Sequence, residues 1–262
     1  MFWKGWLQMT NKILITSLTL LICSAGLAEI GKQNSQADPN SMLLAGPGAW
    51  ITIKPYKGMD TTIYPIPVVT AVSAPFYFFI DTAGCRLFSD SNMTFDVIGK
   101  LRTDGYDADR SDDFDGMHDR NMTIDVGGEF GISGDWGNLY ARILTDTLGQ
   151  HDGQEYRVTY AKPFKFEKSK ISPSVGFALL SSNLADYYYG VRSDEASAGR
   201  PAYNPGASVN WFVGLDANYQ LNDDWTLLTS ITYYWLDSDI RNSPIVNKDY
   251  TISILAGAMY RF

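Results

Sequence analysis

Apolar and polar residues alternate along much of the chain, and the alternation has the period of a β-strand. At the C-terminus, "TISILAGAMYRF" (251–262) places a uniformly apolar row, which takes every second residue from Ile252 to Phe262, opposite a mixed row. Successive strand side chains point to opposite faces, so this segment predicts a strand with one apolar face. The same alternation recurs in "MTIDVGGEFGI" (122–132) and "SVNWFVGLDANYQL" (208–221). The chain therefore predicts an all-β protein.

The alternating segments are joined alternately by short turns and by long polar loops. The short turns are expected at 89–92, 133–136, 167–170 and 222–225, and the long loops at 104–121, 149–154, 183–206 and 238–248. Strands of about ten residues with aromatic ends, joined in this way, are typical of a transmembrane antiparallel up-and-down β-barrel, with short turns in the periplasm. Closure of the barrel is compulsory in lipid because an open edge leaves backbone groups unsatisfied. The expected strands are 93–103, 122–132, 137–148, 155–166, 171–182, 207–221, 225–237 and 249–262.

The number of strands depends on the segment before residue 93. Strands are expected at 49–56 and 64–72, although two prolines interrupt the ladder of the second. "FYFFIDTAGCRLF" (76–88) forms either one strand or two strands that meet near 82–84. A periplasmic N-terminus requires an even number, so splitting this segment gives twelve strands, which we favour. Leaving it whole and omitting 49–56 gives ten. Barrels of this size tend to have filled interiors.

The N-terminus has the pattern of a secretory signal peptide. Lys12 precedes an apolar run of about ten residues, and small residues follow up to Ala28. The run is short for a membrane helix, so an uncleaved anchor is the less favoured alternative. We therefore expect a cleaved signal peptide at 1–28, a periplasmic stretch at 29–47 and the barrel at 48–262. Removal of the signal leaves Cys85 as the sole cysteine, so no intrachain disulfide is expected.

The net charge of the chain bears on whether nucleic acid is a partner. The full chain has a formal net charge of −8. From residue 29 onward it has 19 basic and 29 acidic residues, a balance near −10. An acidic balance of this size argues against nucleic acid as a partner.

Two histidines and one acidic loop are the candidates for chemistry. His118 and His151 lie in predicted loops beside Asp119 and Asp152, and a His–Asp pair can polarise a water for hydrolysis. Neighbouring residues on a strand point to opposite faces, so a histidine and the aspartate beside it make a poor dyad there. The alternatives are that both histidines are turn residues, or that a histidine of one loop pairs with an aspartate of the other. The acidic run 104–116 has enough carboxylates for calcium, although its spacing does not match an EF-hand. We favour a solvated loop there, and we expect no catalytic residue, metal or cofactor.

Charged residues also occur on the inward rows of the expected strands. Buried charges must be paired or hydrogen-bonded, so a polar plug that fixes the barrel is favoured over a narrow aqueous path. The expected interior charges are Asp96, Lys100, Arg102, Asp125, Glu129, Arg142, Asp146, Arg157 and Asp216.

The loop 183–206 is the best candidate for a specific interaction. It is long, and tyrosine and arginine are enriched at protein interfaces. The loop can serve as a binding surface or as a lid over the barrel mouth. Its candidate residues are Tyr187, Tyr188, Tyr189, Arg192, Arg200 and Tyr203.

Several stretches resemble the MltA-interacting protein family, also called the OmpV family. The most specific are "ADYYYGV" (185–191) and "SPIV" (243–246), supported by "DGMHDRNMTIDVG" (115–127) and "GQHDGQE" (149–155). The resemblance implies a barrel of the Gram-negative outer membrane without catalysis of its own. Such a barrel would scaffold a lytic transglycosylase and a bifunctional peptidoglycan synthase.

The partners that follow from this interpretation also include outer-membrane lipid, lipopolysaccharide and the barrel assembly machinery. The alternatives are a permeability or adhesion protein and, less favoured, a hydrolase at the barrel rim.

Overall fold

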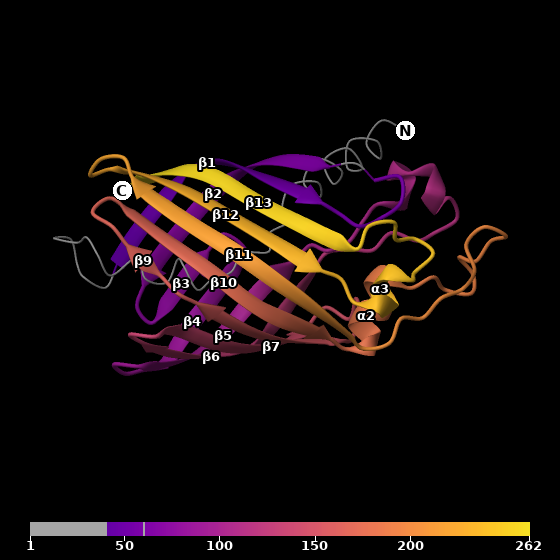
Figure 1. Ribbon diagram of the computed structural model, residues 1–262, viewed down its shortest axis with the longest axis horizontal. Coiled ribbons are helices and arrows are strands. Elements are labelled where there is room, and N and C mark those ends of the chain that lie inside the picture. The colour runs from indigo at the N-terminus through magenta and orange to yellow at the C-terminus, as the bar shows by residue number, and fades with distance from the viewer. Residues whose placement is uncertain (1–40, 60) are drawn as a thin grey trace, which may run out of the picture.

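A computed structural model describes residues 41–59 and 61–262, and antiparallel strands in it close into a β-barrel (Figure 1). Consecutive strands pair from β1 to β8 and from β10 to β13, β8 pairs with β10, and β13 pairs with β1. The short β9 pairs with β10 alone, so twelve strands form the wall. The strands are β1 (Ser41–Ile53), β2 (Thr62–Ser73), β3 (Phe76–Phe79), β4 (Thr82–Ser89), β5 (Met93–Arg102), β6 (Thr123–Gly134), β7 (Gly137–Asp146), β8 (Gln154–Ala161), β9 (Phe164–Lys165), β10 (Ser169–Leu180), β11 (Ser208–Gln220), β12 (Trp225–Trp235) and β13 (Tyr250–Arg261).

The twelve-strand prediction is confirmed, with two corrections near the N-terminus. The segment 76–88 does split, but its turn lies at Ile80 and Asp81 rather than at 82–84. The first strand begins at Ser41, so residues 41–47 belong to the barrel wall and not to a stretch that precedes it. The predicted signal peptide at 1–28 and the remainder of that stretch lie outside the described residues.

The later strands agree with the sequence pattern within two residues at each end, with one exception. The strand predicted at 155–166 ends at Ala161, and β9 resumes the pairing at Phe164 opposite Ile171. Pro163 lies between the two pieces. Proline has no N–H to give to the ladder, which explains why regular pairing stops there.

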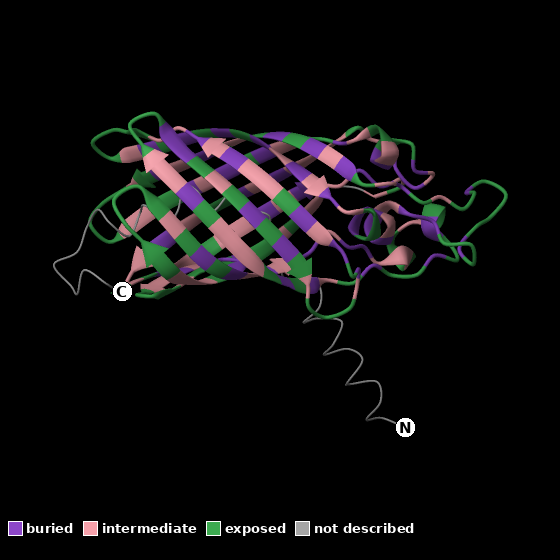
Figure 2. Ribbon diagram, turned by 90° about the horizontal axis from the view of Figure 1, so that it is seen from below, coloured by how far each residue is buried: buried purple, intermediate pink, exposed green. Residues whose placement is uncertain are grey.

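Buried and more exposed residues alternate along the strands (Figure 2). The exposed rows are largely apolar and aromatic residues lie at both rims, as lipid requires. Exposed Trp211 and Trp235 pair near one end, and exposed Trp136 and Phe166 lie near the other. We call the first the loop end, because the long loops gather there, and the second the turn end, where the short turns and the C-terminus lie (Figure 1).

The interior has two chemically different walls. Strands β12, β13 and β1 to β3 contribute a cluster of buried apolar side chains. The inward rows of β4 to β11 are mostly polar or charged. The apolar cluster consists of Leu44, Trp50, Ile66, Val68, Phe79, Ile80, Leu228, Leu255 and Met259.

Short helices lie in the loops of the loop end: α2 (Ser182–Tyr189), α3 (Ser238–Arg241) and the 3₁₀ turns η2 (Ala108–Arg110) and η3 (Asp112–Phe114) (Figure 1). The Asp237 carboxylate caps α3 by accepting the Asp239 N–H. No helix among the described residues is both long and apolar enough to cross a bilayer.

Candidate functional site: a plugged loop end above a salt-bridged lumen

The long loops pack together into a hydrophobic plug across the loop end. Their side chains form one buried cluster, in which the rings of Tyr56, Tyr106 and Phe114 meet edge to face. Such aromatic contacts add to the stabilisation from burial itself. The plug therefore closes the barrel mouth with a small core of its own. Its buried members are Tyr56, Tyr106, Phe114, Met117, Leu180, Leu184, Ala185, Tyr187, Tyr188, Val191, Leu236, Ile240, Ile245 and Val246.

A fully buried ion pair joins two of these loops. Arg120 donates through both terminal nitrogens to the Glu195 carboxylate, each at 2.8 Å, and neither side chain is exposed to solvent. Glu195 also accepts the backbone N–H groups of His118 and Arg192. Burial alone would raise the pKa of Glu195, but these hydrogen bonds outweigh it and lower the pKa to about 2. The pair therefore locks the loop 103–122 to the loop 181–207.

The structure places the six candidate residues of the 183–206 loop mostly inside the plug. Tyr187 and Tyr188 are buried on α2. Arg200 is buried too, and its guanidinium donates hydrogen bonds to the backbone carbonyls of Asp113 and Asp115. Tyr189 and Tyr203 are half-buried. The side chain of Arg192 is exposed and therefore accessible to a partner. This arrangement fits a lid over the barrel mouth better than an exposed binding surface.

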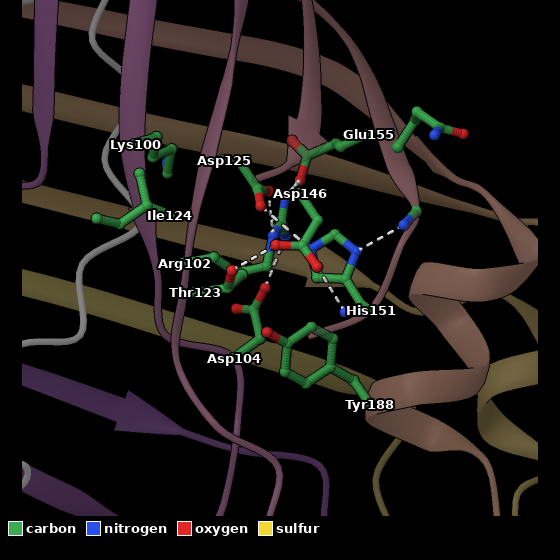
Figure 3. A network of polar contacts seen from close by, with 12 residues as sticks. Lys100, Arg102, Asp104, Thr123, Ile124, Asp125, Asp146, His151, Glu155 and Tyr188 are labelled. Carbon is green, nitrogen blue, oxygen red and sulfur yellow. Dashed lines mark hydrogen bonds and ion pairs between the residues drawn. The ribbon is translucent and has the colours of Figure 1, made fainter. Parts of the chain in front are cut away.

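Beneath the plug, Arg102 is the centre of an ionic network (Figure 3). Its guanidinium contacts Asp125 at 2.6 Å, Glu155 at 2.7 Å and Asp104 at 2.8 Å. Glu155 in turn accepts from Arg157 at 2.8 Å. These charges come from β5, β6, β8 and the loop after β5, so the network ties together the side of the wall from β5 to β8. A buried network of this kind is stable only because each charge has partners.

The remaining predicted interior charges lie on the same polar wall. Arg142 binds Glu129 through two nitrogens, and Lys100 lies 3.4 Å from Asp81. Asp96 forms a bidentate pair with Arg86, a residue that the sequence analysis missed. Arg86 and Asp96 are register partners on adjacent strands, so the alternation of β4 and β5 could have identified the pair.

Two of the predicted charges have other surroundings. Asp146 holds the 147–153 loop by accepting the Thr123 hydroxyl and the backbone N–H of His151. Asp216 is buried opposite Ser230, nearer the turn end.

Both histidines pair with an aspartate, but neither pairs with its neighbour in sequence. His151 is buried, with Nε2 at 3.1 Å from Asp125, while its Nδ1 accepts the Gly153 N–H at 3.0 Å. Nδ1 is therefore the acceptor, and Nε2 carries the proton that it donates to Asp125. His118 lies on the surface and contacts Asp194 at 3.0 Å.

The same geometry argues against a metal centre. His151, Asp125 and Asp146 place potential ligand atoms within 4.8 Å of one another. A metal at Nε2 would require the proton on Nδ1, and the Gly153 N–H already points at that atom. Asp125 is also bound to Arg102. The donor set therefore fits a hydrogen-bonded support for the loop rather than a metal site.

The acidic run 104–116 is tied into the plug largely through its backbone. Asp104 binds Arg102, and the carbonyls of Asp113 and Asp115 accept from Arg200. Outside the run, Asp119 accepts the Ala108 N–H. These contacts use the loop as a structural cover, and the absence of a defined calcium site there stays a prediction.

Comparison with known proteins agrees with this fold. The family model described as MltA-interacting protein MipA matches residues 45–262. The chain is 28% identical to the MltA-interacting protein of Escherichia coli (strain K12), over 97% of this chain and 100% of that protein. It is 31% identical to the outer membrane protein OmpV of Vibrio cholerae serotype O1, over 60% of this chain and 61% of that protein. The outer membrane protein Omp26La of Vibrio anguillarum matches with the same identity and coverage.

These relatives and the closed barrel with lipid-facing rows place the chain in the outer membrane.

Proposed function

Because this chain belongs to the MltA-interacting protein MipA family of outer-membrane barrels, we propose that it is a non-catalytic scaffold for peptidoglycan-remodelling enzymes. In this role it holds a lytic transglycosylase, and with it a bifunctional peptidoglycan synthase, at the inner surface of the outer membrane. Two of its relatives, from Escherichia coli and Shigella flexneri, are named MltA-interacting protein, and the match covers the whole length of each. The proposal extends that naming to this chain.

The observation that best supports a binding role is the filled barrel. A hydrophobic plug covers the loop end, and the Arg102 network of ion pairs lies below it. Two cavities lined by plug and network residues are about 40 and 60 Å³, room for a few waters at most. A barrel built in this way is a rigid frame rather than a conduit, so its surface is where we place its function.

The partner surface must lie at the turn end, because the short turns of such barrels face the periplasm. The connection between β8 and β10 (162–168) is the longest described there. Its Phe164 and Phe166 are exposed, and Lys165 and Lys168 beside them are exposed too. No other described turn at this end carries a basic residue, and the turn between β11 and β12 carries Asp223 and Asp224. A basic, aromatic turn on an acidic protein is suited to an acidic patch on a partner.

Site-specific photo-crosslinking in intact envelopes tests the proposal. Probes at Lys168, Asp135 and Asn222 sample three turns, and all three positions are exposed. We expect crosslinks to a transglycosylase or synthase from Lys168, and weaker or absent crosslinks from the other two. A probe at exposed Arg192 on the loop end is the matched control. Crosslinks to protein from Arg192 alone would refute a periplasmic scaffold and favour an outward role such as adhesion.

A further inference from the structure

The barrel wall has a notch beside β2. The register of β2 with β3 covers only Thr70–Ser73, whereas its register with β1 runs along the whole strand. The β3–β4 hairpin turns back at Ile80 and Asp81, well below the loop-end rim of β2. Towards the loop end, the β3-facing edge of β2 therefore has no neighbouring strand within the described chain.

Two prolines lie on this unpaired edge. The Val69 carbonyl accepts the Ile80 N–H, so odd-numbered residues of β2 direct their backbone groups towards the notch. Pro65 and Pro67 share that direction and have no N–H to leave unsatisfied. Unpaired donors are costly beside lipid. The two prolines would break a hydrogen-bond ladder inside a sheet. They therefore suit the edge of β2 that faces the notch.

A cavity of about 300 Å³ lies at the loop-end corner of the notch. The 3₁₀ turns of the 103–122 loop cover it: Arg110 donates to the Tyr64 hydroxyl, and the Ser111 hydroxyl donates to the Lys57 carbonyl. Its lining combines cations, hydroxyls and one exposed apolar side chain. The residues concerned are Lys54, Arg110, Tyr106, Thr61, Thr62 and Ile63.

The lining contains donors that a ligand could use. The Lys54 ammonium has three donors and gives one to the Gly105 carbonyl. Arg110 is exposed at the cavity and adds a guanidinium, which suits phosphate oxygens. A cluster of cationic donors of this kind is suited to bind an anion with several acceptor oxygens.

We propose that this cavity binds the phosphate-bearing headgroup of an outer-leaflet lipid, whose acyl chains lie along the outward apolar row of β2. That row begins at Ile63, which is 63% exposed, and continues through exposed Pro65 and Pro67. Free phosphate is the less suitable ligand, because the acidic loop 104–116 and the net charge of −8 repel a diffusing anion. A lipid phosphate is held in place by its acyl chains. The proposal is independent of the scaffold function.

Native mass spectrometry of the full barrel in neutral detergent tests the proposal. Phosphorylated lipid A, chemically dephosphorylated lipid A and inorganic phosphate are titrated separately. We expect the phosphorylated lipid to bind at least tenfold more tightly than the dephosphorylated lipid, and this preference to fall below twofold in a K54Q/R110Q variant. The matched control R241Q removes an exposed cation from α3 and should keep the full preference.

A second readout keeps the test decisive. Burial lowers the pKa of Lys54 to about 8, and a bound phosphate should raise it in lysine-labelled spectra. Equal binding of the two lipids overturns the proposal. Binding of inorganic phosphate that depends on Lys54 and Arg110, without any lipid preference, also overturns it and indicates an adventitious ion only.

Discussion

The buried Arg120–Glu195 pair makes the clearest prediction about the plug. Replacing Glu195 with Gln keeps the side-chain shape but removes the negative charge that faces a buried guanidinium. Breaking one partner of a buried pair typically costs about 3–5 kcal/mol. Arg120 would still donate to the carbonyls of Tyr187 and His118, so we expect the lower end, about 3 kcal/mol. That free energy corresponds to roughly a hundredfold more frequent opening of the plug.

Amide hydrogen exchange of the refolded barrel measures this opening directly. In E195Q, protection should fall about a hundredfold in segments 113–121 and 187–203, while the strand amides of β11 remain unchanged. D194N is the matched control: it alters the neighbouring residue, whose contact with His118 is solvent-exposed. Exposed pairs contribute little, so this variant should change exchange less than threefold. If E195Q leaves plug protection within threefold of the wild type, the pair does not hold the loops and our reasoning is wrong.

Three further predictions follow from the same geometry. Because the pKa of Glu195 is depressed to about 2, its contribution to plug stability is complete above its unfolded pKa near 4.5 and is lost as the pH falls towards 2. The protection of the plug amides, taken relative to the exchange rate of unstructured amides at each pH, should therefore fall between pH 6 and 2.5 in the wild type and change much less in E195Q. Planar-bilayer recordings of the wild type at neutral pH should show no conductance steps, and regular steps would contradict a filled lumen. Zinc added to the barrel should not raise its unfolding temperature, because both ring nitrogens of His151 are engaged; a rise that disappears in H151A would show that the site binds metal after all.

The sequence pattern predicts most of the barrel because lipid imposes a simple rule on every strand. Each outward residue must be apolar, so alternation locates strands such as β11 and β12 almost to the residue. The first strand was partly missed because "GPG" (46–48) has the composition of a turn. In the structure, a Cβ on Gly46 would come within 1.9 Å of the Ala258 carbonyl, so this glycine serves close packing of β1 against β13.

The alternation of residues predicts which charges of the candidate site face inward, but not which partners they contact. Alternation identifies inward charges such as Arg102 and Asp125, which lie on adjacent strands. It does not reveal that Arg102 also reaches Glu155 on β8, since that contact depends on barrel curvature and side-chain reach across the lumen. The plug is the part least predictable from the sequence. Its contacts, such as that of Arg120 with Glu195, join residues 75 positions apart in loops that have no periodic pattern.

The two ends of the barrel therefore suit different tasks. At the loop end, the plug buries aromatic rings and an ion pair, and the notch lies beside β2, next to its exposed apolar row. At the turn end, exposed Phe166 and Lys168 project beyond the wall in a connection longer than pairing requires. Under the proposed function, a protein partner in the periplasm is recognised at the turn end. Under the further inference, the loop end binds a lipid of the membrane that surrounds it.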